Sequence, residues 1–260
     1  MTRFSIFFLY FIIIVIYNYY IMLDIDWFKF ENKNLDFPFY KKNPYLPKWG
    51  WIVLFFCICL GFLFQLVEAS DFPSMVKALV FGFFGCCIMI VPILYFLKWD
   101  YKAIFQKPSL RDIALALGLF VGYLIYALCI GSVLDMIHIS SPVLVNESTT
   151  TIFSIPPLIF SLMGEEIIKF VPFIFFLRIL YKYTDNRKLS VIASMLLVMA
   201  FFAFLHSFEP KYFLFAFCVQ GLGSIFEFIG YIKTKNILVS YITHLCTDVF
   251  IFTMIILGVA

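Results

Sequence analysis

Charged residues are scarce in this sequence. They make up 13% of its 260 residues, whereas soluble domains carry about 25%. The formal net charge is only +3, and no block of basic residues concentrates it, so nucleic acid is not expected as a partner. Internal repeats and low-complexity tracts are lacking too. We therefore expect a single domain over residues 1–260.

Recognisable metal-ligand patterns are also missing. The seven cysteines are an odd number and have no zinc-ligand spacing, and the sequence has no His-Glu-x-x-His motif. All seven lie within apolar stretches: Cys57, Cys59, Cys86, Cys87, Cys129, Cys218 and Cys246. We expect buried packing thiols rather than disulfides, and we expect no metal or other cofactor.

Apolar side chains dominate, at 63% of the residues. A transmembrane helix needs about 20 of them in a row. Eight windows of this kind occur, at 4–23, 51–67, 78–97, 113–134, 154–177, 189–207, 212–232 and 237–258. The sequence predicts an all-α membrane protein with about eight transmembrane helices, four in residues 1–150 and four in 151–260. The first window is too long for a signal peptide and is interpreted as an uncleaved span.

The basic residues of the loops predict the orientation. Fifteen of the nineteen follow spans one, three, five and seven, and only Arg3, Lys77 and Lys211 lie on the opposite side. The positive-inside rule then places both termini outside the cytoplasm of a cell-membrane, multi-pass protein. The aromatic, mixed-charge segment 24–50 is expected to lie along the cytoplasmic interface or to form an ordinary long loop.

A few ionisable residues remain at membrane depth, where each costs several kcal/mol and marks a functional site or a buried pair. They are Glu165, Glu166, Lys169, His206, Glu227, His244 and Asp248. Spacings of three and four residues place Lys169 on one helix face with Glu166 and Glu165, and His244 on one face with Asp248. All except Glu227 are expected to meet in the outer half of the bilayer. Glu227 is expected nearer the inner interface, reaching toward Lys233 or Lys235.

Such a cavity suits the activation of water. A carboxylate among apolar walls can act as a general base near neutral pH, and an imidazole can orient the water or stabilise an oxyanion. The alternative for Glu165, Glu166 and Lys169 is a buried salt-bridge cluster that fixes the packing of the helices.

Three short motifs carry a resemblance. They are "GEEIIKF" at 164–170, Phe202-x-x-x-His206 and His244-x-x-x-Asp248. Together they resemble the motifs of the type II CAAX prenyl endopeptidases, which belong to the CAAX protease and bacteriocin-processing superfamily. The resemblance covers residues 155–258. Phe170 stands where that family has arginine. Lys169 and Asp248 match the PrsW-like branch instead, which has glutamate where this chain has His206.

The resemblance implies an intramembrane glutamic-type endopeptidase that cleaves a membrane-associated or exported peptide without a covalent intermediate. Glu165 would be the general base, His206 would hold the water, and His244 with Asp248 would stabilise the oxyanion. Glu166 would be a supporting carboxylate paired with Lys169, and Phe202 would belong to the second motif.

Other classes of function remain open from the sequence. A degenerate family member could serve as a scaffold for a membrane protein partner. A zinc metallopeptidase is a further alternative, since Glu, His and Asp can all bind zinc. A proton-coupled transporter is another, since intramembrane carboxylates and histidines also build proton relays.

Overall fold

A computed structural model describes residues 35–40, 44–66, 74–139, 150–207 and 209–258. Within these ranges every regular element is a helix, and no strand occurs. The long helices are α2 (Lys48–Gln65), α3 (Ser74–Phe96), α4 (Leu110–Met136), α5 (Leu158–Thr184), α6 (Arg187–His206) and α9 (Ile237–Ile256). Between α6 and α9, α7 (Pro210–Ala216), the π-helical turn η4 (Phe217–Gly221) and α8 (Ile225–Thr234) follow one another. Two short 3₁₀ turns, η2 (Tyr101–Ala103) and η3 (Ile152–Ser154), lie in the connections.

Six helical stretches are long and apolar enough to cross a membrane, which indicates a multi-pass membrane protein. They are α2, most of α3, α4, α6, the run Pro210–Thr234 and α9. The remaining long helix, α5, has 27 residues but carries Glu165, Glu166 and Lys169. Seven of the eight predicted spans thus fall on helices, and the predicted span at 4–23 lies outside the described residues.

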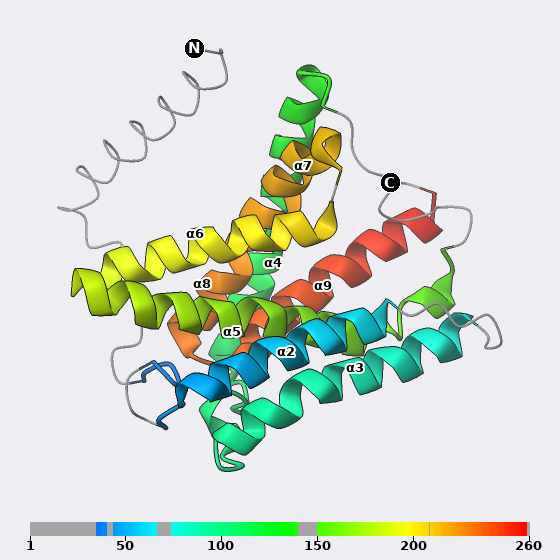
Figure 1. Ribbon diagram of the computed structural model, residues 1–260. Helices are drawn as coiled ribbons and strands as arrows, with labels where there is room; N and C mark the ends of the chain where they lie inside the picture. Colours follow the sequence, from blue (N-terminus) through cyan, green and yellow to red (C-terminus); the bar gives the residue numbers. More distant parts are fainter. Residues whose placement is uncertain (1–34, 41–43, 67–73, 140–149, 208, 259–260) are drawn as a thin grey trace.

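Helix α5 lies at the centre of the bundle and contacts α2, α3, α6 and α9 (Figure 1). The pairs α2–α3 and α5–α6 pack side by side, and α4 and α8 both pack on α9. The start of α2, the end of α3, the α5–α6 turn and the α8–α9 turn lie toward the same side of the molecule (Figure 1). We call this side the basic end, because the loops with most lysines and arginines belong to it.

Two tight turns at the basic end are built alike. The sequences Thr-Asp-Asn at 184–186 and Thr-Lys-Asn at 234–236 each place the middle residue in a left-handed conformation, with φ of 48° and 55°. In each turn the asparagine side chain accepts from a backbone N–H of the next helix, at 3.1 Å and 3.2 Å. Such caps satisfy donors that a helix start leaves free. The turns therefore fix α5 against α6 and α8 against α9, the helices that carry the polar residues.

The segment before α2 has turns and irregular backbone where it is described, and several of its side chains are buried. Phe37, Phe39, Tyr40 and Leu46 are buried in the hydrophobic core. The ring of Phe37 packs edge-on to Phe173 of α5 at 5.3 Å. The segment is therefore a loop, as one of the two expectations has it, but its aromatic side chains are buried because removing apolar surface from solvent is favourable. Its position along a membrane interface stays a prediction.

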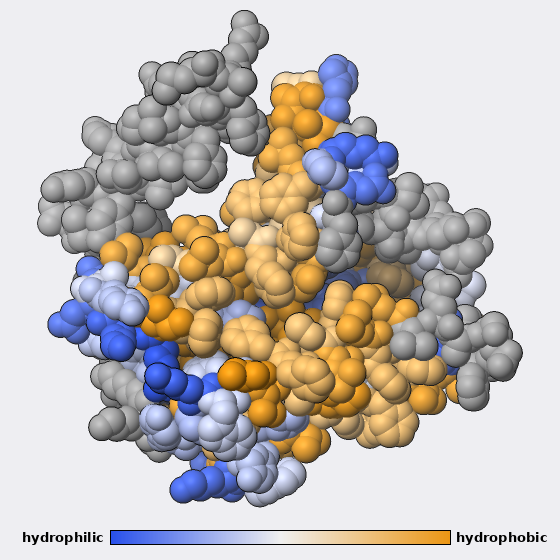
Figure 2. Space-filling model, in the orientation of Figure 1, coloured by the Kyte–Doolittle hydropathy of each residue, from blue (hydrophilic) through white to orange (hydrophobic). Residues whose placement is uncertain are grey.

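The outer surface is largely apolar. Figure 2 shows hydrophobic residues over most of the visible face, with hydrophilic ones gathered toward the basic end and, in a smaller group, at the opposite end beside α7. All seven cysteines are free, and Cys59 and Cys129 are exposed while only Cys86 is buried. The expectation of buried packing thiols is therefore wrong for these two, since an apolar stretch of a membrane helix has a lipid-facing side as well as a core side.

Candidate active site

The ammonium group of Lys169 lies between carboxylates from two helices. Its Nζ is 2.5 Å from Oε1 of Glu166, one turn earlier on α5, and it also forms an ion pair with Glu227 of α8. Lys169 and Glu166 are each 3% exposed. The predicted pairing of Glu227 with Lys233 or Lys235 is wrong. Glu227 lies seven residues before the end of α8 at Thr234, about 10 Å along the axis, which is deep enough to meet Lys169.

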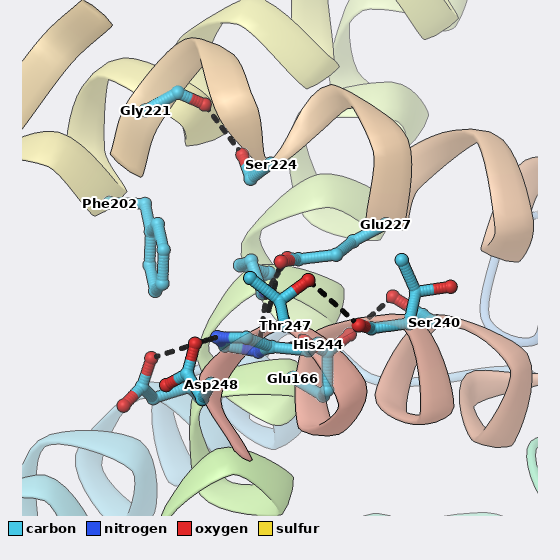
Figure 3. A network of polar contacts seen from close by, with 12 residues as sticks. Glu166, Phe202, Gly221, Ser224, Glu227, Ser240, His244, Thr247 and Asp248 are labelled. Carbon is cyan, nitrogen blue, oxygen red and sulfur yellow. Dashed lines mark hydrogen bonds and ion pairs between the residues drawn. The ribbon is translucent and has the colours of Figure 1, made fainter. Parts of the chain in front are cut away.

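Glu166 is held by three partners. Its Oε1 lies 2.8 Å from Nδ1 of His244 in addition to the Lys169 contact, and its Oε2 accepts from the hydroxyl of Ser240. Ser240 and His244 are four residues apart and share one face of α9. Figure 3 shows both side chains directed at Glu166, with Glu227 approaching from the opposite helix. The second glutamate of the pair is thus fully engaged.

His244 is surrounded by acidic groups. Its Nε2 lies 3.8 Å from Oε2 of Glu165 and 3.9 Å from Oδ1 of Asp248. Its Nδ1, besides Glu166, is 3.9 Å from Oε1 of Glu227. Four carboxyl groups therefore face one imidazole and one ammonium. This excess of hydrogen-bond acceptors suits a site that takes up a proton.

Exposure divides the cluster in two. The side chains of Glu165 and Asp248 are 25% and 27% exposed, whereas those of Glu166, Glu227 and His244 are 8% exposed or less. Neighbouring residues of a helix point in directions about 100° apart. Glu166 consequently faces the closed interior while Glu165 faces a more accessible side. Glu165 also lies near the start of α5, far from the end of this helix at the basic end.

His206 stands beside this cluster. Its Nδ1 lies 2.9 Å from the carbonyl oxygen of Phe202, and the two rings pack edge-on at 4.5 Å. The ring of Phe202 in turn lies 4.7 Å from Nζ of Lys169. Among the residues that the structure describes, no hydrogen bond or ion pair joins His206 to Glu165, His244 or Asp248. Phe202 is therefore the contact between the second motif and Lys169 of the first.

Phe170, the last residue of the GEEIIKF stretch, is 3% exposed and packs edge-on against Tyr231 at 5.2 Å. These two residues, with Glu166, Lys169, Glu227 and Ser240, line a cavity of about 10 Å³, enough for about one water molecule. The hydroxyl of Tyr231 is buried and has no hydrogen-bond partner among the described residues. Phe170 thus makes an aromatic contact, and Lys169 supplies the cation that pairs with the carboxylates of this cluster.

Three of these side chains could hold a metal ion. Ligand atoms of Glu166, Glu227 and His244 all lie within 4.8 Å of one another, and three protein ligands are usual for catalytic zinc. However, the ammonium of Lys169 contacts both carboxylates and lies 3.4 Å from Nδ1 of His244. A metal would have to displace this ammonium, so the residues fit a lysine-centred ion cluster better than a zinc site.

The structure brings together Glu165, Glu166, Lys169, His244 and Asp248, all of which the sequence singled out. It adds Glu227, which the sequence analysis placed outside this cluster, and Ser240, which the sequence analysis did not name. The depth of Glu227 within its span signalled a buried partner, and Ser240 precedes His244 by one turn on the same face. Neither signal could identify Lys169 or Glu166 as the partner.

The chain matches no protein-family model, no curated protein and no solved structure.

Proposed function

We propose that this chain is an intramembrane peptide hydrolase of the glutamic type, in which Glu165 activates water. The observation that carries this proposal is the arrangement around Nε2 of His244, where the accessible carboxylates of Glu165 and Asp248 lie at 3.8 Å and 3.9 Å. The three motifs that resemble the CAAX protease superfamily contain all three residues.

These two distances suit a bound water. They are too long for direct hydrogen bonds, yet a water molecule between polar groups bridges separations of this size. Such a water would lie between Glu165, His244 and Asp248, on the accessible side of the cluster. It could then meet the carbonyl carbon of a peptide that enters there.

Glu165 is better suited than Glu166 to act as the base. Both oxygens of Glu166 are engaged, Oε1 by Lys169 and His244 and Oε2 by Ser240. Glu165 is 25% exposed, and its ion-pair contact within the described part of the chain is with Nε2 of His244 at 3.8 Å. A general base must be able to reach the proton that it removes. Only Glu165 of the adjacent pair meets this requirement.

The other residues would position the reacting groups. A hydrogen bond from Nδ1 of His244 to Glu166, at 2.8 Å, would fix the ring so that Nε2 faces the water, as in other sites where a third group orients an imidazole. Asp248 would hold the water from the opposite side. His206 would contribute through Phe202, which lies between it and Lys169.

In the proposed reaction the water oxygen attacks the peptide carbonyl while its proton passes to Glu165. The tetrahedral intermediate collapses, the carbon–nitrogen bond breaks, and Glu165 returns the proton to the leaving nitrogen. The products are a carboxylic acid and an amine, and no covalent enzyme intermediate forms. The substrate would be a membrane-associated or exported peptide, because the accessible carboxylates lie away from the basic end.

The test is comparative proteomics of membrane peptides from cells that carry the wild type or Glu165→Gln. We expect the substitution to reduce cleavage by at least about 10²-fold, the usual contribution of a general base, with membrane insertion unchanged. Glu209→Gln is the matched control, since Glu209 is exposed and pairs only with Lys211 within the described residues. Cleavage by purified wild type should also survive a metal chelator.

Retained cleavage in Glu165→Gln would overturn the assignment. Loss of cleavage upon chelation, restored by zinc, would instead favour a metallopeptidase. If a stoichiometric membrane partner co-purifies and function survives in both Glu165→Gln and His206→Ala, the chain is a scaffold rather than an enzyme.

A further inference from the structure

An apolar groove runs along the outer face of α2, away from the polar cluster. It has a volume of about 550 Å³ and is lined by Lys48, Ile52, Phe55 and Cys59 among other residues of α2, with Phe175 contributed by α5. Ile52 is 70% exposed, so this face is not covered by another helix of the described bundle. None of the residues that line the groove takes part in the proposed hydrolysis.

The groove has the length of one lipid leaflet. Its lining residues on α2 recur at intervals of three and four residues, which places them in one stripe along the helix. From Lys48 to Cys59 the chain advances eleven residues, about 16 Å along the axis. Half of a hydrocarbon core about 30 Å thick is about 15 Å. A single acyl chain that starts at Lys48 would therefore end near the middle of the bilayer.

The floor of the groove is made of packed aromatic rings. The ring of Phe175 contacts Trp51 at 5.2 Å and Phe55 at 5.1 Å, both edge-on. Trp51 also packs against the buried ring of Phe39 at 6.3 Å. A preformed surface of this kind binds an apolar chain with little ordering cost.

The entrance of the groove carries a positive charge. Lys48 is the only charged residue in its lining, and the first turn of α2 has no acidic residue. Lys48 starts α2 at the basic end of the bundle, which is the predicted cytoplasmic side. Basic pockets beside membrane helices on this side bind anionic lipid head groups.

We propose that this groove is a binding site for an anionic phospholipid of the surrounding bilayer, with one acyl chain along α2 and the phosphate at Lys48. The site is independent of the proposed hydrolase activity. It differs from general lipid contact because the head group is selected by charge and the acyl chain lies on a fixed aromatic floor.

Tryptophan quenching by brominated lipids tests this site, because Trp51 lines the groove. A variant that keeps only Trp51, with Trp27, Trp49 and Trp99 replaced by Phe, is reconstituted in phosphatidylcholine vesicles. Small fractions of dibrominated phosphatidylglycerol or dibrominated phosphatidylcholine are then added. We expect stronger quenching of Trp51 by phosphatidylglycerol, and an about fivefold loss of this preference in Lys48→Gln, the effect of one basic residue near the membrane surface.

Two controls make the result specific. Lys48→Arg keeps the charge and should keep the preference. A variant with Trp99 as its only tryptophan should show little preference, because Trp99 is 61% exposed and lies outside the groove. Equal quenching of Trp51 by the two lipids, or a preference that Lys48→Gln leaves unchanged, would overturn the proposal.

Discussion

Replacing Lys169 with Met removes the cation that two buried carboxylates share. Glu166 and Glu227 would keep their places, with side chains 3% and 8% exposed, but would lose their ammonium partner. Breaking a buried ion pair by removing one partner costs about 3–5 kcal/mol. We expect Lys169→Met to lower the free energy of unfolding by an amount in this range at neutral pH.

The charge imbalance, rather than the lost side-chain volume, should cause most of this effect. Adding Glu227→Gln removes one of the two orphaned charges, so the double variant should be more stable than Lys169→Met alone. The coupling between the two sites should be about 1–3 kcal/mol, as is usual for groups in direct contact. The loss in Lys169→Met should also shrink at lower pH, because a protonated carboxyl group needs no cation.

The assay is unfolding in mixed detergent micelles, followed by circular dichroism, at neutral and at mildly acidic pH. Lys211→Met is the matched control. Its ion pair with Glu209 spans 3.2 Å between side chains that are 65% and 64% exposed, and such solvent-exposed pairs contribute little to stability. The reasoning would be refuted if Lys169→Met were as stable as Lys211→Met, or if Glu227→Gln destabilised it further.

Two further changes test the packing of the bundle. A Cβ atom at Gly61 of α2 would lie 2.6 Å from a backbone oxygen of α3. Gly61→Ala should therefore lower the free energy of unfolding by about 1–3 kcal/mol in the same assay. Gly118→Ala is the control and should be neutral or slightly stabilising, because a Cβ atom there would have no other atom within 4 Å. At the basic end, Asp36→Asn breaks a partly exposed 3.0 Å ion pair with Arg187 and should lower the free energy of unfolding by less than about 1 kcal/mol. Phe37→Ala removes a side chain that is 2% exposed and should lower it by about 3–5 kcal/mol. Similar losses for the two variants would contradict the view that aromatic burial stabilises this segment.

The hydropathy of the chain was enough to predict most of its helices. Seven predicted spans fall on helices of the structure, because membrane helices satisfy their own backbone hydrogen bonds and need only a sufficiently long apolar run. Helix periodicity also predicted that Glu166 and Lys169 share a face, and their Nζ–Oε1 distance is 2.5 Å. These are local properties of a single helix.

Segment 35–47 shows where local reasoning stops. Its charges and aromatic residues are equally compatible with a segment that lies along a membrane interface, an exposed loop, or a loop with buried aromatic side chains. Only the space left between the helix ends at the basic end decides that Phe37, Phe39 and Tyr40 are buried. The hydropathy of a short segment does not contain that information.

The polar cluster also has some features that the sequence predicts and others that depend on the packing of the helices. The sequence by itself determined which ionisable residues lie at membrane depth and which of them share a helix face. Only the tertiary structure decided that Glu227 pairs with Lys169, that Ser240 and His244 hold Glu166, and that Glu165 remains accessible. The physical reason is that contacts between helices depend on the rotation and relative depth of each helix, which packing of the whole bundle sets and no single segment encodes.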